Sequence, residues 1–256
     1  MDEPARHSVD IEGRQLSCLD FGGSGQPLLA LHGHFADGRT FAALARALGP
    51  RWRLIAPDQR GHGWSERAAE VSRDGYVGDA VAVLEHFGLT DVVVLGHSLG
   101  GVNAYQLAAR HPRLVQALVI EDIGAEVDGD LSFCLSWPHR VPTRAALIET
   151  LGDSAQYVED AVREYPDGWG LVFEARDMVL SQELLNGDHW GDWLASVCPA
   201  LLVHGRHSTV LSGRHAKDMA ARRPRTQLVE LATGHTVRES DSMGFAAAVR
   251  GFLDGL

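Results

Sequence analysis

The stretch that decides the fold is VVVLGHSLGG, residues 92–101. An apolar run leads into a Gly-x-Ser-x-Gly motif centred on Ser98, and a helical pattern follows it. Glycine is required at positions 96 and 100 because side chains there would collide with neighbouring backbone at a sharp strand-to-helix turn. This pattern is typical of a nucleophile elbow, which exposes a serine hydroxyl above a sheet. It also places the Leu99 amide at a helix N-terminus, which favours a developing negative charge.

The composition is that of an acidic chain with one large core. With 256 residues and 45% hydrophobic content, the sequence fits one α/β domain. Its net charge of −11 argues against a nucleic-acid or anionic-membrane partner, because no basic stripe is available to neutralise phosphates. The N-terminal residues lack the apolar core of a signal peptide, and no stretch is long enough to cross a bilayer. We therefore expect a cytoplasmic protein, and the sequence leaves a homodimer open.

Cysteine and histidine are the residue types that most often bind transition metals, and the chain has three cysteines and a closely spaced pair of histidines. Cys18, Cys134 and Cys198 lie far apart without Cys-x-x-Cys spacing, which indicates reduced thiols. His32 and His34 alternate on an extended segment, but no nearby carboxylate and third histidine complete a ligand set. We expect neither a metal nor another cofactor.

Short apolar runs alternate with helical stretches through most of the chain. Two alternating segments at 9–11 and 15–19 predict an antiparallel hairpin. Buried strands are predicted at 28–31, 54–56, 92–95, 117–120, 200–203 and 227–231, and helices at 40–48, 76–87, 99–110, 213–222 and 243–253. This alternation predicts an α/β fold with a mostly parallel sheet.

The alternation stops between residues 125 and 197. This segment has helical pieces divided by proline and glycine, and it holds four of the six tryptophans. We expect a core domain of residues 1–124 and 198–256 and a helical cap of residues 125–197 over an apolar pocket. The candidate pocket residues are Phe133, Trp137, Trp169 and Trp190, whose alternative role is to attach the cap to the core.

Three further motifs accompany the elbow in a fixed order. They are Leu31-His32-Gly33 after the strand at 28–31, Asp58-Gln59-Arg60-Gly61-His62-Gly63-Trp64-Ser65 after the next strand, and Gly234-His235 after the last strand. With these motifs the chain resembles the α/β-hydrolases, in the branch of lid-bearing esterases, C–C hydrolases and cofactor-free haloperoxidase-like enzymes. The resemblance implies an eight-stranded mostly parallel sheet with its second strand antiparallel and a helical cap after the sixth strand. It also implies that Ser98 is the nucleophile, His235 is the base, and the backbone N–H groups of Leu99 and His34 form the oxyanion hole.

The chemistry of Ser98 also requires a base. A serine hydroxyl is a poor nucleophile unless a neighbouring group takes its proton, and histidine has the pKa suited to this near neutrality. His235 follows the strand at 227–231, so it lies at the same sheet edge as Ser98.

The acid that should orient His235 is where the sequence departs from this family. Residues 204–212 read HGRHSTVLS where relatives carry an Asp, and neither Ser208 nor Thr209 is a carboxylate. Some branches place the acid one strand earlier, where this chain has Asp122. Glu121 would point to the opposite face by strand alternation. We predict Asp122 as the acid; the alternatives are that Asp122 only begins the cap, that a Ser208 or Thr209 hydroxyl orients His235, or that the usual acid has been lost.

These residues predict a serine hydrolase that cleaves a carboxylic ester, lactone or thioester with an apolar part through an acyl-enzyme on Ser98. A C–C bond hydrolase or a cofactor-free perhydrolase would use the same Ser98 and His235. A ligand-binding receptor or pseudoenzyme on the same scaffold is the alternative of another class, supported by the missing acid after the strand at 200–203.

Overall fold

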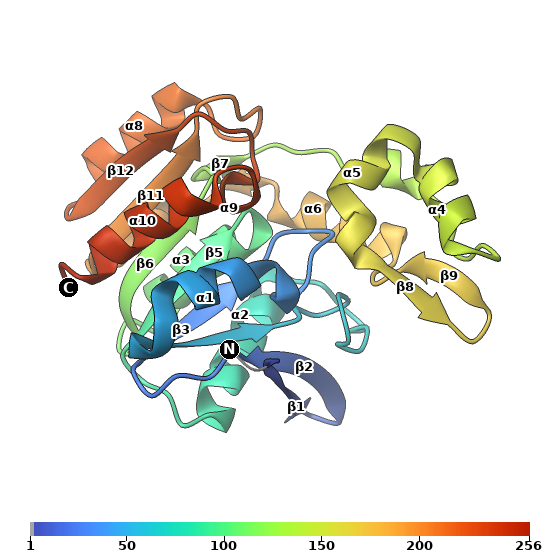
Figure 1. The fold of residues 1–256 in the computed structure, drawn as a ribbon. Helices are drawn as coiled ribbons and strands as arrows, with labels where there is room; N and C mark the ends of the chain where they lie inside the picture. Colours follow the sequence, from blue (N-terminus) through green and yellow to red (C-terminus); the bar gives the residue numbers. More distant parts are fainter. Residues whose placement is uncertain (1–2) are drawn as a thin grey trace.

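The computed structural model describes residues 3–256, and its centre is one eight-stranded sheet (Figure 1). The strands are β1 (Ala5–Ile11), β2 (Arg14–Asp20), β3 (Gln26–Leu31), β4 (Trp52–Pro57), β5 (Val92–His97), β6 (Val115–Glu121), β11 (Ala200–Gly205) and β12 (Thr226–Leu231). They lie in the order β1-β2-β4-β3-β5-β6-β11-β12. Only β2 pairs antiparallel with its neighbours β1 and β4, and the other pairs are parallel. The predicted α/β-hydrolase topology is confirmed.

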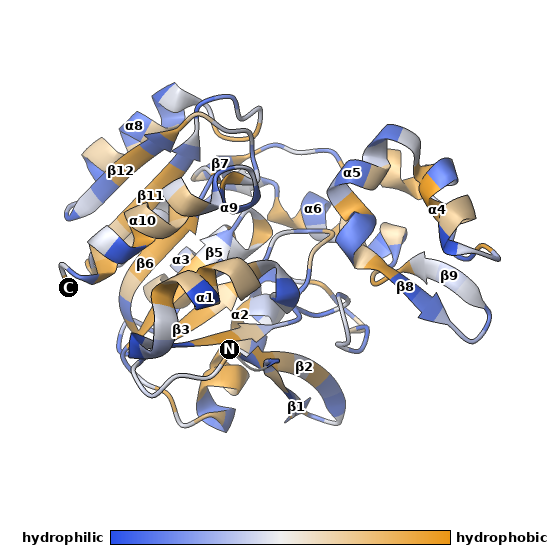
Figure 2. Ribbon diagram, viewed as in Figure 1, coloured by the Kyte–Doolittle hydropathy of each residue, from blue (hydrophilic) through white to orange (hydrophobic). Residues whose placement is uncertain are grey.

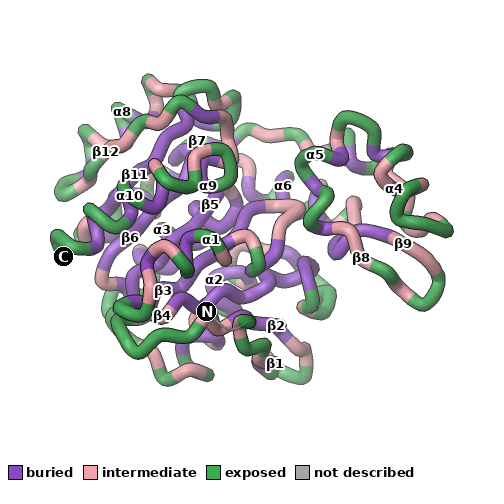
Figure 3. The backbone as a smooth tube through the Cα atoms, viewed as in Figure 1, coloured by how far each residue is buried: buried purple, intermediate pink, exposed green. Residues whose placement is uncertain are grey.

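Helices cover both faces of this sheet. One face packs against α2 (Arg73–His86), α3 (Leu99–Arg110) and α8 (Gly213–Arg222), and the other against α1 (Ala42–Leu48) and α10 (Ser242–Leu253). Strand β5 serves both layers, because Val92 and Val94 belong to the first apolar cluster and Val93 and Leu95 to the second. Figures 2 and 3 show the result as an apolar, buried sheet beneath helices with hydrophilic outer sides.

The helix boundaries follow local capping. Helix α2 begins at Arg73, three residues before the predicted start, because the Ser72 side chain accepts a hydrogen bond from the Gly75 N–H and caps it. The short helical pieces of the core are α9 (Val237–Ser240) and the 3-10 turns η1 (Gly38–Phe41) and η2 (Gly49–Arg51).

The segment between β6 and β11 carries the cap. Its helices are α4 (Arg144–Leu151), α5 (Ala155–Val158), α6 (Ala175–Leu185) and α7 (Trp190–Ala195), with 3-10 turns η3 (Ser132–Ser136), η4 (Gly152–Ser154) and η5 (Glu159–Ala161). In Figure 1, α4, α5 and the hairpin beside them project away from the sheet. They enclose a separate apolar cluster that includes Leu147, Val158 and Met178. The division into core and cap domains at residues 125 and 197 stays a prediction.

This segment is not purely helical, which corrects the expected description. It also contains two two-stranded antiparallel sheets, one of β7 (Glu126–Val127) with β10 (Gly187–Asp188) and one of β8 (Val162–Tyr165) with β9 (Gly168–Leu171). Pro166 and Asp167 form the turn of the second hairpin, in which Tyr165 pairs with Gly168. Gly168 begins β9 at φ +135°, a conformation that favours glycine. The proline and glycine that predict a break between helices therefore mark a β-hairpin turn.

Within residues 3–256, none of the helices combines the length and the apolar character needed to cross a bilayer.

Candidate active site

Ser98 lies on a strained turn between β5 and α3. Its backbone has φ 52° and ψ −120°, a conformation that non-glycine residues rarely adopt. A Cβ added at Gly96 would lie 2.1 Å from the carbonyl oxygen of Gly100, and one added at Gly100 would lie 2.1 Å from that of Leu31. Both glycines are therefore required by close backbone approach, as the sequence predicts. The Ser98 residue itself is partly exposed.

Asp122 and His235 are in direct contact. His235 Nδ1 lies 2.8 Å from Asp122 Oδ2, and the carboxylate is completely buried while the imidazole is 27% exposed. Asp122 has φ 50°, so the chain turns sharply where β6 ends and the cap begins. With Nδ1 held by the carboxylate, His235 Nε2 is the ring nitrogen available to a reacting group. Within residues 3–256, no hydrogen bond joins Ser98 Oγ to His235; such bonds are often long in ligand-free enzymes.

The residues after β11 support Asp122 instead of replacing it. Ser208 Oγ donates a short hydrogen bond to Asp122 Oδ2, and the Gly205 N–H donates to Oδ1 at 2.8 Å. Ser208 Oγ in turn accepts from the Val210 N–H at 3.1 Å. Thr209 is exposed, and neither hydroxyl contacts His235 in the described chain. The structure therefore brings Ser208 to the carboxylate and leaves Thr209 outside the site.

Glu121 points to the opposite face of the sheet, as strand alternation predicts. Its buried carboxylate accepts from the Arg238 N–H at 2.8 Å and from Arg238 Nη1 at 3.0 Å. Arg238 Nη2 also donates to Thr40 Oγ1 at 2.7 Å. Burial raises the pKa of Glu121, although Arg238 opposes this shift. This ion pair holds the first turn of α9, which begins two residues after His235.

The loop after β3 passes beside the elbow. A Cβ added at Gly33 would lie 2.7 Å from His97 Nδ1 and 3.1 Å from the Ser98 Cβ, so only glycine fits. His32 Nδ1 donates to the Gly33 carbonyl at 2.7 Å, and its Nε2 accepts from the Gln59 N–H at 2.9 Å. Burial lowers the pKa of His32 to about 4, so the ring is neutral and fixes the loop. The Leu99 and His34 amides stay predicted oxyanion donors.

The His34 side chain connects this loop to the cap. His34 Nε2 lies 2.9 Å from the hydroxyl of Ser181 on α6, which lies 3.0 Å from the Tyr76 hydroxyl on α2. Sequence reasoning missed both contacts, because no local pattern indicates a partner 147 residues away.

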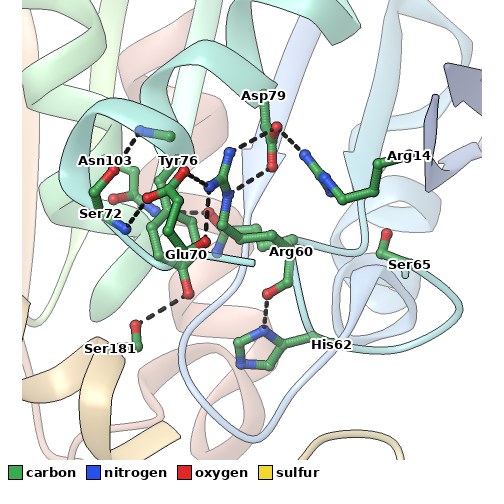
Figure 4. Close-up of polar contacts among 12 residues, drawn as sticks. Arg14, Arg60, His62, Ser65, Glu70, Ser72, Tyr76, Asp79, Asn103 and Ser181 are labelled. Carbon is green, nitrogen blue, oxygen red and sulfur yellow. Dashed lines mark hydrogen bonds and ion pairs between the residues drawn. The ribbon is translucent and has the colours of Figure 1, made fainter. Parts of the chain in front are cut away.

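A buried charge network next to these hydroxyls explains the motif at residues 58–65 (Figure 4). Arg60 donates to both oxygens of Asp79 at 2.9 Å and also pairs with Glu70, while Arg14 reaches the same Asp79. The pairs hold the loop that follows β4 against α2. Asp58 fixes the other end of this loop by accepting from the Gly38 and Trp64 N–H groups at 2.8 and 3.0 Å.

An aromatic cluster joins the loop to the cap. Phe35, with φ 68°, places its ring 5.3 Å from Trp137, 6.0 Å from Phe133 and 5.1 Å from Phe173. The Phe133 and Trp137 rings are 5.6 Å apart. Phe133 and Trp137, two of the predicted pocket residues, therefore contact the loop that follows β3. Phe35 also lines a pocket of about 390 Å³ whose other walls include Asp37, Arg39, Glu159, Asp160 and Glu239.

The other two predicted pocket residues, Trp169 and Trp190, differ in their positions. Trp169 pairs with Val141 through its backbone and packs against the same cap cluster as Phe35 and Trp137. Trp190 donates from Nε1 to Glu126 at 2.7 Å and lies under the Arg222 guanidinium at 3.7 Å. Trp190 is the first residue of α7, and its ring lies 5.4 Å from that of His215 on α8. It packs against the core cluster and not the cap cluster, which corrects the expectation that it lines a pocket with Phe133 and Trp137.

The family model for the alpha/beta hydrolase fold matches residues 26–181. The chain belongs to this family.

Proteins similar to this chain include hydrolases of several kinds. A putative esterase/lipase of Haemophilus influenzae is 32% identical over 96 residues, which cover 38% of this chain and 33% of that protein. A 2-hydroxymuconate semialdehyde hydrolase of a Pseudomonas species is 28% identical over 90% of this chain and 88% of its own length. The crystal structure of E-2-(acetamidomethylene)succinate hydrolase superposes with a TM-score of 0.89 at 23% identity, covering 98% of this chain and 99% of that one. The chain spans less than two thirds of the first three curated relatives it matches.

Buried neutral histidines give this α/β hydrolase a specific pH dependence of stability. Burial lowers the pKa of His62 to about 3 and that of His32 to about 4, and it holds the pKa values of His34 and His97 well below the usual range. The unfolded chain therefore binds more protons below pH 6.5, so stability is complete above that value and falls as the pH decreases toward 4. At pH 5.5 we expect a loss of ~1.4 kcal/mol in unfolding free energy for each such histidine.

Urea unfolding of wild type and His62→Gln at pH 7.5 and 5.5 measures this effect. The variant should lose less stability between the two pH values than wild type, by the contribution of one histidine. His86→Gln, which removes an exposed histidine, is the control. An equal loss in wild type and His62→Gln would contradict the assignment of His62 as a buried neutral group.

Proposed function

We propose that the chain is a serine hydrolase that cleaves a carboxylic ester, lactone or thioester through an acyl-enzyme on Ser98. The observation that supports it most is the 2.8 Å contact between His235 Nδ1 and the buried Asp122 carboxylate, at the sheet edge that carries the elbow. A carboxylate on Nδ1 fixes the tautomer in which Nε2 can accept a proton.

In this proposal, the steps follow from the positions of the three side chains. His235 Nε2 takes the proton of the Ser98 hydroxyl as its oxygen attacks the substrate carbonyl. The N–H groups of Leu99 and His34 stabilise the oxyanion, and the protonated His235 then gives its proton to the leaving alcohol or thiol. Water, deprotonated by His235, attacks the acyl-enzyme and releases the acid. The Asp122 carboxylate stabilises the imidazolium that forms in each half of the reaction.

The second candidate is a C–C bond hydrolase with the same Ser98 and His235. The observation in its favour is the alignment with 2-hydroxymuconate semialdehyde hydrolase over 90% of this chain. A cofactor-free perhydrolase would also use these residues. The case for a receptor or pseudoenzyme rests on the missing acid after β11. The contact between Asp122 and His235 argues against it, because Asp122 supplies a carboxylate to the histidine.

Removal of the nucleophile tests the proposal directly. Ser98→Ala should lower turnover of a 4-nitrophenyl ester by about 10⁶-fold, because the triad acts as a unit. Wild type should also be labelled by a fluorophosphonate, and Ser98→Ala should not. Ser240→Ala, at an exposed serine on α9, is the matched control. Unchanged hydrolysis by a pure Ser98→Ala preparation would refute the mechanism.

The position of the acid gives a second prediction. Asp122→Asn should reduce turnover by ~10³ to 10⁴-fold, because the amide no longer stabilises the imidazolium and its tautomer. Ser208→Ala removes one hydrogen bond to the carboxylate and should cost about tenfold, from the ~1.5 kcal/mol of a bond to a charged group. Thr209→Ala should have no effect.

The same variants distinguish Asp122 as the acid from a site in which the usual acid after β11 has been lost. Ser208→Asp should lower activity, because it places a second carboxylate against Asp122 and one of the pair must hold a proton. If the usual acid has only been lost, Ser208→Asp or Thr209→Asp should instead raise activity and Asp122→Asn should be nearly silent. Initial rates on one activated ester, with thermal unfolding of each variant, decide between these outcomes.

The aromatic cluster predicts substrate selectivity. Trp137→Ala should shift the preference among 4-nitrophenyl esters of increasing acyl length. The ratio of kcat/KM between neighbouring substrates should change by an amount equivalent to ~1–3 kcal/mol in activation free energy. Trp190→Ala is the control, since this tryptophan packs between α7 and α8. Identical acyl-length profiles in folded Trp137→Ala and wild type would assign Trp137 to cap attachment alone.

A further inference from the structure

Arg73, the first residue of α2, carries a guanidinium group with unused hydrogen-bonding capacity. Its Nη1 donates to Asn103 Oδ1 on α3 at 2.8 Å. Its Nε and Nη2 are shielded from solvent and have no hydrogen-bond partner within residues 3–256. Arg73 also forms no ion pair with any carboxylate in the described chain. A cation without a carboxylate partner in such a place is unfavourable unless a ligand supplies the missing charge.

The three most deeply buried arginines within residues 3–256, Arg60, Arg223 and Arg238, have partners for their donor groups. Arg60 pairs with Asp79 and Glu70, and Arg238 pairs with Glu121. Arg223 has no carboxylate, but its Nε, Nη1 and Nη2 all donate hydrogen bonds, to Trp193, Thr226 and Ser196 respectively. Arg73 differs from all three because two of its nitrogens have no acceptor.

The charge on Arg73 persists at neutral pH. Burial lowers the pKa of its guanidinium to about 10, which leaves the group protonated at neutral pH. The Tyr76 ring lies 4.6 Å from the guanidinium carbon and compensates part of the lost hydration.

Two chains of side chains connect Arg73 to the loop beside Ser98. In the first, Asn103 Nδ2 donates to Gln59 Oε1 at 2.7 Å, and the Gln59 amide donates to the His32 carbonyl. In the second, Tyr76, on which Arg73 stacks, bonds Ser181, which bonds His34. Figure 4 shows Asn103, Tyr76 and Ser181 around one region between α2, α3 and the cap. Both chains end on the loop that carries the proposed oxyanion donor, and α3 itself begins at Leu99.

The unused edge has the geometry of a carboxylate site. Nε and Nη2 lie on the same side of a guanidinium and can bind both oxygens of one carboxylate. Elsewhere in this protein, Arg67 uses this edge to bind Asp177, with both N to O distances 2.6 Å. Arg73 presents the same edge without an acidic side chain.

We propose that Arg73 binds a carboxylate of the substrate, so that the substrate class of the proposed hydrolase is an anionic ester, lactone or thioester and not a wholly apolar one. This inference rests on the proposed function. The aromatic cluster around Phe35 then takes the apolar part of the same molecule. Other atoms of the protein cover the Arg73 edge, so a carboxylate must displace them to reach it, and it is then selected by charge as well as by shape.

Matched neutral and anionic esters test this assignment. The probes are the 4-nitrophenyl half esters of glutaric, adipic and suberic acids and the 4-nitrophenyl esters of the unbranched monocarboxylic acids with the same number of carbons, with spontaneous hydrolysis subtracted. Wild type should prefer at least one half ester over its neutral partner by tenfold or more in kcat/KM. Arg73→Met should reduce that ratio at least tenfold, and Arg73→Lys should reduce it less. The control is Arg110→Met, which removes a partly exposed arginine paired with Asp74.

A binding measurement keeps the inference testable without turnover. Free glutarate, adipate or suberate should raise the melting temperature of wild type and of Ser98→Ala, and the shift should be lost in Arg73→Met. If Arg73→Met does not fold, Arg73→Lys and the wild-type preference are sufficient. Equal kcat/KM values for every acid and its neutral partner, with no melting shift, would overturn the inference while leaving ester hydrolysis intact. Absence of both ester hydrolysis and fluorophosphonate labelling would instead refute the proposed function, and the melting shift would still decide the role of Arg73.

Discussion

The site depends on one buried carboxylate, that of Asp122. It accepts hydrogen bonds from the end of β11, from the loop after β11 and from His235, and it thereby joins three segments that are more than 80 residues from it in sequence. Water is excluded from this carboxylate, so its charge acts on His235 with little screening. The order of the strands makes the arrangement possible, because β6 lies between β5, which carries Ser98, and β11. Asp122 and Ser98 therefore follow neighbouring strands at the same edge of the sheet.

The sequence was most informative where local chemistry determines the outcome. The apolar runs predict six of the eight core strands, and the alternating segments at 9–11 and 15–19 predict the hairpin of β1 and β2. The elbow glycines can be assigned from the sequence because their backbone contacts are short-range. Asp122 could be proposed because a carboxyl-edge position on a predicted strand limits which residues can approach His235. Strand alternation also separated it from Glu121, and the structure places the two carboxylates in different networks.

Contacts between distant segments could not be predicted in this way. The sequence allows the Ser208 hydroxyl to be a partner of His235, but in the structure this hydroxyl binds Asp122. The path of the loop after β11 determines which of the two residues it reaches, and the sequence does not give that path. Trp190 and Trp137 are both tryptophans of the segment at residues 125–197, yet Trp190 packs beside α8. The residue type alone does not give the direction of a side chain on a short helix, so the sequence could not separate the two. The ion pairs of Arg60 and the lack of acceptors for Arg73 Nε and Nη2 depend on which elements pack together. No local sequence pattern predicts either of them.

The position of Asp122 at the root of the cap has a consequence for building chimaeras. Although Asp122 is one of the last residues before the cap, every hydrogen bond of its carboxylate is to the core, and Glu121 before it holds the opposite side of the His235 loop through Arg238. A cap transplanted from another member of the family should therefore be joined after Gly124. A junction placed three residues earlier, after Glu121, would exchange Asp122 along with the cap, so the carboxylate partner of His235 would then depend on the donor protein.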